Sequence, residues 1–274
     1  MNAIVPRLGR WLAAVVVVAG SACATGPMET AIRLEKVAQP GPAGSRWQQV
    51  EPVAAGLRVW RDEQPLRPTT GMRLQAGDVV ETGPGTAALI RFGASGSTVL
   101  DARTRVRIGS LEVFFGRVFA DVRGFFQTAS ETVVAGVSGT RFLFQVRPDR
   151  STRIAVAQGE VTCTPRRGAW SPIRLRPGEA LVVEDDERAE PRSAAADPAE
   201  LREAAALADR VAGAAAQGWC CFGGRVQPAW SDACPGGRFS TILGEAESFC
   251  EPPRRPELHR EPRPEPRREP PYPR

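Results

Sequence analysis

Residues 137–146 read Val-Ser-Gly-Thr-Arg-Phe-Leu-Phe-Gln-Val. After the Gly-Thr turn, Phe142, Phe144 and Val146 alternate with Arg141, Leu143 and Gln145. A period of two places alternate side chains on opposite faces of a strand. This stretch therefore predicts a β-strand that buries one face against a core.

The same alternation recurs on both sides of this stretch, without amphipathic helices between the repeats. The further predicted strands lie near residues 57–60, 88–92, 103–108, 111–115, 117–122, 132–137, 153–157, 160–164, 173–175 and 180–183. Gly- and Pro-containing turns separate them, as at Gly83-Pro84-Gly85 and Pro177-Gly178. Short, evenly spaced strands favour an all-β sandwich, barrel or short β-solenoid over residues 53–185.

The predicted β domain lacks the residue groupings of an active site. It holds no histidine, no paired acid and base and no phosphate-cradling glycine loop. Cys163 lies in the strand-like Val161-Thr162-Cys163-Thr164, where a cysteine usually acts as a small buried hydrophobe. The single histidine, His259, falls in the tail, so pairing with Cys163 is disfavoured. We expect no catalytic residue, no metal and no cofactor, and hence not an enzyme.

The N-terminus is typical of an export signal. Arg7 and Arg10 precede an apolar stretch that ends in small residues before Cys23. Residues 1–22 therefore predict a lipoprotein-type signal peptide, with a lipid on Cys23. Cleavage after Ala24 and an uncleaved anchor remain alternatives, although the apolar stretch is short for a membrane span. Ala24 favours the outer membrane, and we expect a periplasmic, lipid-anchored protein.

Weakly apolar segments flank the predicted domain. Residues 23–52, with Pro40-Gly41-Pro42, indicate a linker. The acidic run 184–187 suggests a solvated domain edge, with a calcium loop as the alternative. Residues 186–218 predict a second linker with an Ala-rich helix, in which Asp197 is the N-cap and Pro198 the first helical residue. Its weak apolar stripe suggests a connecting helix.

The C-terminal part predicts a small Cys-rich module over residues 219–251. It contains Cys220, Cys221, Cys234 and Cys250, and four cysteines in a short exported segment favour disulfides. Since adjacent cysteines seldom bridge each other, Cys220 and Cys221 should pair with Cys234 and Cys250, in either of two ways. Zinc is the alternative, although no Cys-x-x-Cys pair is present. Residues 252–274, rich in Pro, Arg and Glu, predict a disordered tail.

The chain is basic but carries an unusual set of cations. Its 274 residues have a net charge of +5, and Lys36 is the only lysine among 36 basic residues. An exported protein meets little nucleic acid, so we expect no nucleic-acid partner and interpret the charge as surface solvation. Contact with anionic cell-wall polymers, through Arg103, Arg105, Arg107 and the tail, is a second possibility.

Several local motifs in residues 74–183 occur in the order found in the FecR domain family, which this region resembles. They are Ala76-Gly77-Asp78-Val79-Val80-Glu81-Thr82-Gly83, Ser97-Thr98-Val99-Leu100-Asp101, Leu111 followed by Gly116-Arg117-Val118, Val137-Ser138-Gly139-Thr140-Arg141-Phe142, Gln158-Gly159-Glu160-Val161 and Pro177-Gly178-Glu179. The ordered set is more specific than any single motif. The motif positions singled out are Gly77, Asp78, Asp101, Gly116, Gly139, Thr140, Arg141, Phe142, Gly159 and Gly178.

The resemblance implies the family's all-β periplasmic fold and a protein-binding role. Members of the founding type span the membrane: a cytoplasmic domain controls a sigma factor, and the periplasmic part senses an outer-membrane receptor. The segment before Trp11 is too short to fold as such a cytoplasmic domain, so we expect only the periplasmic half of that function. The sequence therefore predicts a non-enzymatic binding or signalling accessory whose partner is an envelope protein. A structural envelope protein that contacts anionic wall polymers is the alternative.

Overall fold

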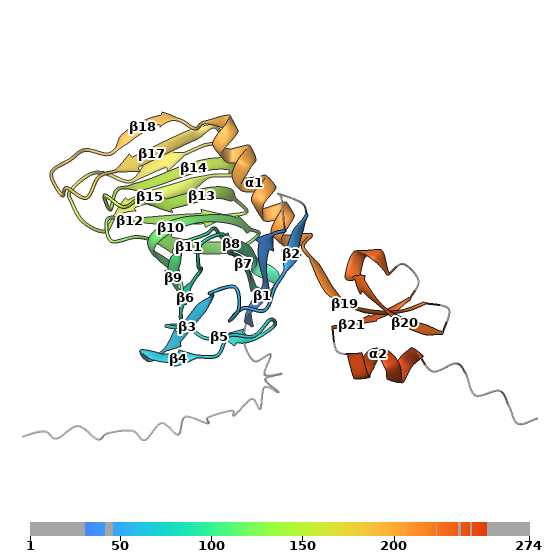
Figure 1. The fold of residues 1–274 in the computed structure, drawn as a ribbon. Helices are drawn as coiled ribbons and strands as arrows, with labels where there is room; N and C mark the ends of the chain where they lie inside the picture. Colours follow the sequence, from blue (N-terminus) through green and yellow to red (C-terminus); the bar gives the residue numbers. More distant parts are fainter. Residues whose placement is uncertain (1–30, 42–45, 223, 235–236, 242, 251–274) are drawn as a thin grey trace, which may run out of the picture.

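The computed structural model describes residues 31–41, 46–222, 224–234, 237–241 and 243–250. The predicted signal segment, Cys23, His259 and the tail lie outside these residues. The described chain is mostly β, as the alternation predicted, and its strands form a sandwich followed by a small module (Figure 1).

Sheet A forms the middle layer of the sandwich, and its neighbouring strands are antiparallel. In spatial order its strands are β2 (Trp47–Gln49), β1 (Ile32–Pro40), β7 (Ala87–Phe92), β8 (Gly96–Leu100), β10 (Leu111–Val122), β13 (Arg141–Val146), β14 (Thr152–Gln158), β17 (Glu179–Val183) and β18 (Arg192–Ala195). The short β5 (Arg73–Leu74) pairs with the start of β1. The predicted strand at residues 141–146 therefore lies inside this sheet.

Sheet B forms the second layer and shares β10 with sheet A. In spatial order its strands are β4 (Gln64–Leu66), β3 (Arg58–Arg61), β6 (Val79–Glu81), β9 (Arg105–Arg107), the first part of β10, β11 (Phe125–Ala129), β12 (Val133–Ser138), β15 (Val161–Pro165) and β16 (Ile173–Leu175). Its neighbours are antiparallel, except that β10 and β11 run parallel. Short 3-10 turns lie at Gly93–Ser95 and Ser231–Ala233.

The strand β10 passes from one sheet to the other through a bend at Gly116. Phe115 still pairs with β9, whereas Gly116 pairs with Val146 of β13. Gly116 has a φ of +98°, and a Cβ there would lie 2.5 Å from the Cα of Thr104, so the bend requires glycine. The sequence predicted separate strands at residues 111–115 and 117–122. That prediction was wrong, because the glycine bends the strand without ending it.

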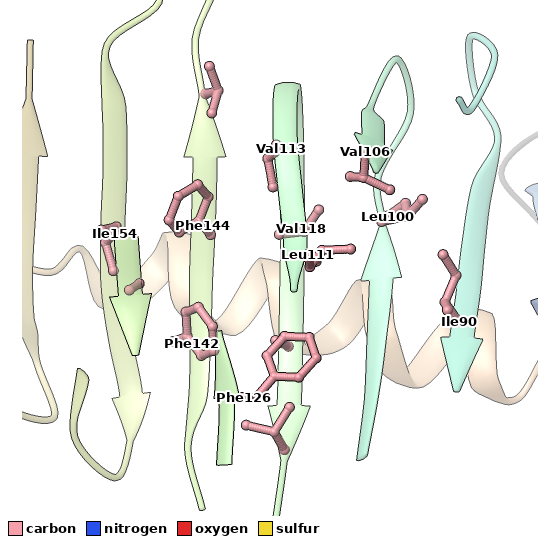
Figure 2. Packing of buried hydrophobic residues seen from close by; sticks show 14 of the residues in the cluster. Ile90, Leu100, Val106, Leu111, Val113, Val118, Phe126, Phe142, Phe144 and Ile154 are labelled. Atoms are coloured by element: carbon pink, nitrogen blue, oxygen red, sulfur yellow. The ribbon is translucent and has the colours of Figure 1, made fainter. Parts of the chain in front are cut away.

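Sheets A and B pack face to face around one apolar core (Figure 2). Phe142, Phe144 and Ile154 contribute from sheet A, and Val106, Leu111 and Phe126 from sheet B, all at 7% exposure or less. Burying a side chain of this size contributes about 1.5–3 kcal/mol. The two sheets thus form the two layers of a β-sandwich.

The helix α1 (Pro198–Ala212) covers the other face of sheet A and forms the third layer (Figure 2). It begins as predicted, with the Asp197 carboxylate accepting from the Ala199 amide at 2.8 Å. Its side chains Ala204, Leu207 and Val211 pack on sheet residues such as Leu89 and the small Ala87, Ala155 and Ala180. The prediction of a connecting helix was therefore wrong. Alanines on both surfaces let the backbones approach closely, so a weak apolar stripe suffices.

The predicted linker over residues 23–52 is also corrected within its described part. Residues 32–40 and 47–49 form β1 and β2 of sheet A. A register shift between Leu34 and Lys36 breaks the alternation of β1, which hid it in the sequence. Leu34 and Val37 contact the central core, whereas Ala38 packs under α1. β1 is therefore buried on both faces and belongs to the domain.

The only lysine of the chain ties β1 to the end of α1. The Lys36 Nζ donates to the carbonyl oxygens of Ala212 at 2.6 Å and Ala214 at 3.2 Å. These carbonyls lack partners within the helix, and a cation there also interacts favourably with the helix dipole.

The Cys-rich module follows α1 and consists of a small sheet and one helix. Its strands, in spatial order, are β20 (Arg225–Trp230), β19 (Ala215–Phe222) and β21 (Arg238–Ser240), with α2 (Leu243–Cys250) beside them. The start of β19 pairs parallel to β2, so the module is joined to the edge of sheet A. β19 begins at Ala215, where the sequence predicted the end of the helical segment near Gly218.

Candidate functional site

The family-motif residues Gly77 and Asp78 form a turn around a buried ion pair. Arg61 donates to both oxygens of the Asp78 carboxylate at 2.8 Å, and the Gln75 amide donates at 2.8 Å. Burial alone raises the pKa of Asp78, but the hydrogen bonds from Arg61 and Gln75 outweigh it, so the pKa lies below its ordinary value. Gly77, with a φ of +94°, turns the chain into this arrangement.

The motif residue Asp101 holds Arg117 beside the bend of β10. The Arg117 guanidinium lies 2.6 Å from the Asp101 carboxylate and 3.1 Å from that of Glu203 on α1. The Thr104 hydroxyl accepts from the Arg117 amide at 3.0 Å and lies 3.2 Å from the Arg117 carbonyl oxygen. The hydroxyl takes the place of the backbone groups that a neighbouring strand would supply. The amide and the carbonyl oxygen of Arg117 therefore stay hydrogen-bonded at the bend.

The remaining motif positions build turns and core. Thr140 donates to the carbonyl oxygens of Ser138 and Glu160 at 3.1 and 3.0 Å. A Cβ on Gly159 would lie 2.7 Å from the Gly139 carbonyl oxygen, so these two turns pack closely. Phe142 is fully buried, and the Arg141 guanidinium lies 3.2 Å from Asp121 at the surface. Gly178 turns the chain before β17 with a φ of +83°.

The structure does not gather the motif residues into one site. They lie at separate turns, at the bend of β10 and in the core, and their contacts are with the domain itself. The motifs that carry the resemblance therefore describe mainly how the domain folds.

The exposed edges of the sheets differ in how open they are to another strand. Proline interrupts β4 at Pro65 and β20 at Pro228, and Pro172 directly precedes the three-residue β16. At the other edge of sheet A, β2 pairs with β19. Pro191 likewise directly precedes β18, but β18 contains no proline, and its residues Arg192–Ala195 are all exposed. Since proline within a strand and pairing both block strand addition, β18, which is longer than β16, is the most accessible of these edges.

The backbone of β18 directs amide groups away from the sheet. The Ala196 amide donates to the Gly178 carbonyl oxygen at 2.8 Å, on the side of β17. Alternate residues of a strand direct their amides to the same edge, so Ala194 faces β17, whereas Ser193 and Ala195 face outward. Small side chains at these positions allow another backbone to approach. The sequence does not mark β18 as a strand, because Ala and Ser are weak strand formers.

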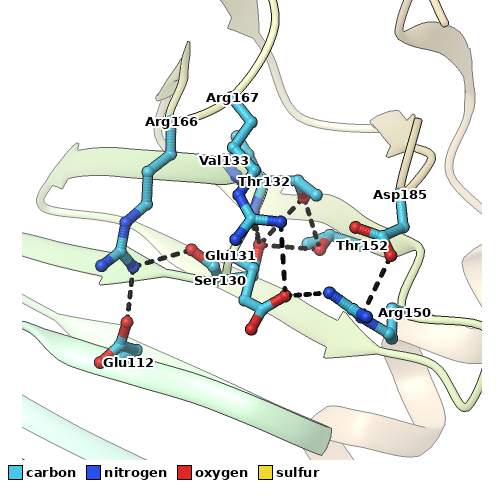
Figure 3. A network of polar contacts seen from close by, with 10 residues as sticks. All are labelled: Glu112, Ser130, Glu131, Thr132, Val133, Arg150, Thr152, Arg166, Arg167 and Asp185. Atoms are coloured by element: carbon cyan, nitrogen blue, oxygen red, sulfur yellow. Dashed lines mark hydrogen bonds and ion pairs between the residues drawn. The ribbon is translucent and has the colours of Figure 1, made fainter. Parts of the chain in front are cut away.

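A polar network closes the rim of the sandwich near the loop of the β17–β18 hairpin (Figure 3). The buried hydroxyls of Ser130, Thr132 and Thr152 lie within 3.2 Å of one another and join the two sheets. Arg150 pairs with Glu131 and, at 3.1 Å, with Asp185 of the acidic run. The run thus forms a hairpin loop held by arginine. Across the described ranges, no group of three metal-ligating side chains is present.

The three arginines that the sequence suggested for contact with cell-wall polymers, Arg103, Arg105 and Arg107, do not lie on one surface. Arg105 and Arg107 lie on the outer face of sheet B, over the Trp60 and Phe114 rings at 5.1 and 5.0 Å. Arg105 also lies 3.5 Å from Glu81, and Arg107 lies 2.8 Å from Glu112. These carboxylates offset much of the charge of the face.

Arg103 lies apart from that face. It occupies the turn before β9, with a φ of +52°, so it does not continue the alternation of Arg105 and Arg107.

The cysteines follow one of the two predicted pairings. Cys220 is bonded to Cys234, and Cys221 to Cys250. Adjacent side chains of β19 point to opposite faces, so each cysteine meets a different partner. Cys163 is free and fully buried in the core, as its strand setting predicted, and burial raises the pKa of its thiol to about 12. Neither helix described here has the length and apolar character to cross a bilayer.

Comparison with known proteins gives a distant likeness. No family model and no curated protein matches the chain. Two solved structures of a "putative anti-sigma factor" from Parabacteroides distasonis match at 18% identity with a TM-score of 0.40. The match covers 45% of this chain and 62% of that one, so it spans less than two thirds of that protein. At this identity the likeness concerns the fold.

Proposed function

We propose that this chain is a non-enzymatic, envelope-anchored accessory in signalling, which binds an extended segment of a partner protein along β18. The observation that carries the proposal is the open edge of sheet A, where the Ser193 and Ala195 amides face outward. A partner strand can accept these amides and extend the sheet, as in other cases of β-augmentation.

Two features support the location within this proposal. The disulfides of the module suit an oxidising compartment. The export signal and the lipid on Cys23, expected from the sequence, would hold the domain at the periplasmic side of the outer membrane. The partner is then an envelope protein that presents an unpaired strand.

Photo-crosslinking in the native envelope tests the proposal. A crosslinking amino acid at Ser193 should give a discrete adduct with one envelope protein, whereas the same residue at Gln64, on the proline-interrupted β4, should give none. Identical adduct patterns from both positions, or no adduct from Ser193, would contradict strand addition at β18.

A pair of proline substitutions distinguishes edge blocking from misfolding. Ala195→Pro removes an outward amide and should abolish the adduct while leaving the melting temperature close to that of the wild type. Ala194→Pro removes an amide that faces β17 and should lower the melting temperature. Full adduct formation by folded Ala195→Pro would overturn the proposal.

A further inference from the structure

A cavity opens beside the bend of β10, at the point where this strand leaves sheet B for sheet A. Its volume is about 490 Å³, within the range of small-molecule sites. Three chain segments that are distant in sequence line it. They contribute Arg103 from the turn before β9, Phe115 and Arg117 from the bend, and Val146 and Arg147 from the end of β13.

The arginines around this cavity are not equally neutralised. Arg117 is held by Asp101 and Glu203, at 2.6 and 3.1 Å, and forms a fixed wall. Within the described part of the chain, Arg103 and Arg147 have no carboxylate at ion-pair distance. The cavity therefore has a surplus of positive charge on its walls.

The acid nearest to Arg147 in sequence is already occupied. Asp149 accepts from both the amide and the hydroxyl of Ser151, at 3.0 and 2.7 Å. These hydrogen bonds and, to a smaller extent, the charge of Arg147 lower the pKa of Asp149. Among the described residues, no hydrogen bond or ion pair joins Asp149 to the Arg147 guanidinium, which keeps its donors for another group.

The floor of the cavity is apolar and includes a side chain that the core does not cover. Phe115 is 39% exposed although it lies in the middle of a strand, and Val146 and Pro148 lie beside it. An exposed aromatic ring in a concave, positively charged setting can pack against the apolar part of an anionic ligand.

Arg103 is one of four described non-glycine residues with a positive φ. Its φ of +52° lies in the left-handed region, where Gly or Asn costs less than arginine. The turn itself therefore does not account for the residue found there. The position of its side chain at the wall of a cavity gives it a use.

We propose that this cavity binds an oxyanion, a carboxylate or a phosphate, that is carried on an apolar stem. Arg103 and Arg147 bind the charged group, and Phe115 contacts the stem. Guanidinium groups suit both oxyanions, because their donors match two oxygens at once. This proposal is independent of β18, which lies on another part of the domain.

Calorimetric titration of the full chain with three matched probes tests the proposal. The probes are 2-naphthoate, 2-naphthyl phosphate and the neutral 2-naphthamide. At least one anionic probe should bind saturably, and more tightly than the amide. Binding of the carboxylate alone, or of the phosphate alone, identifies the oxyanion. Absence of saturable binding by both anions, or equal binding of the amide, would overturn the proposal.

Substitutions locate the binding at this cavity. Arg103→Asn removes the charge with a residue that tolerates the left-handed backbone, and Arg147→Gln removes the second charge. Each should weaken binding roughly tenfold, the effect of losing a charged hydrogen bond. Arg67→Gln, at an exposed arginine outside the cavity, should leave the affinity unchanged. Phe115→Ala should weaken binding of the naphthyl probes.

The melting temperature of each variant provides the folding control. If both folded arginine variants bind the anions as tightly as the wild type does, the assignment of Arg103 and Arg147 to the charged group is wrong. If folded Phe115→Ala retains full affinity, the assignment of the apolar stem is wrong.

Discussion

The β-sandwich and the Cys-rich module differ in what holds them together. In the sandwich, side chains such as Phe142 and Phe144 are fully buried between the sheets, and the single cysteine there remains a free thiol. In the described part of the module, none of the apolar clusters extends past Ala214, and its buried residues include the bonded Cys220, Cys234 and Cys250. The module's sheet is too small to bury much apolar surface, so covalent bonds replace the missing core.

The largest expected effect tests the sandwich side of this comparison. Phe144→Ala should lower its free energy of unfolding by about 3–5 kcal/mol, because a large core side chain leaves a cavity. Phe125→Ala is the matched control, since Phe125 is 74% exposed and should change stability little. Urea denaturation followed by circular dichroism measures both. Equal losses in the free energy of unfolding from the two variants would mean that the core does not dominate the stability of the sandwich.

The next effect concerns the module. Replacing Cys221 and Cys250 together by Ser should destabilise it by about 2–4 kcal/mol, the usual contribution of a disulfide. Hydrogen exchange should then show faster exchange in β19–β21, with no change in sheets A and B.

The thiol of Cys163 provides a control for the sandwich in that variant. Because burial raises its pKa to about 12, it should stay unreactive towards alkylating reagents until the sandwich opens. Labelling of Cys163 in the disulfide variant under native conditions would show that the two regions are not separately stabilised.

The smallest effect comes from a polar contact inside the sandwich. Asp78→Asn should cost about 2 kcal/mol, because it weakens charged hydrogen bonds from Arg61 in a buried setting. Asp121→Asn, which breaks an exposed pair with Arg141, should cost roughly 0.5 kcal/mol or less. Chemical denaturation near neutral pH compares the two variants.

The pH dependence of stability gives a second test of Asp78. Its folded pKa is lowered, so its contribution is present above the unfolded value of about 3.9 and is lost as the pH falls through the lower folded value. Asp78→Asn should therefore be less sensitive to acid than the wild type over this range. An identical acid dependence would show that the carboxylate contributes nothing through ionisation.

Local patterns predicted those strands that have one clear apolar face. The alternation through Ile90 and through Phe144 placed strands correctly, and Asp197 with Pro198 marked the start of α1. β1 was missed, because it is buried on both faces and carries a register shift, so its apolar residues do not alternate. The open edge β18 was missed for the opposite reason, since none of its residues is buried.

The candidate sites were even harder to predict from the sequence than the strands. The sequence marked Asp78, Asp101 and Gly116 as special, and each proved to support a turn, an ion pair or the bend of β10. Nothing local relates Arg103 to Arg147, which line the same cavity beside the bend of β10. Cysteine spacing left two pairings open, and the opposite faces of β19 decide between them.

The β class of the domain, the start of its helix and the disulfides of the module follow from neighbouring residues along the chain, so they could be predicted before the fold was known. The entry of β1 into the sheet, the covering of that sheet by α1 and the open edge at β18 could not. These outcomes depend on contacts between distant residues, such as Lys36 with Ala212, which lie 176 positions apart. Periodicity records which face of a segment is apolar, but not which other segment will cover it.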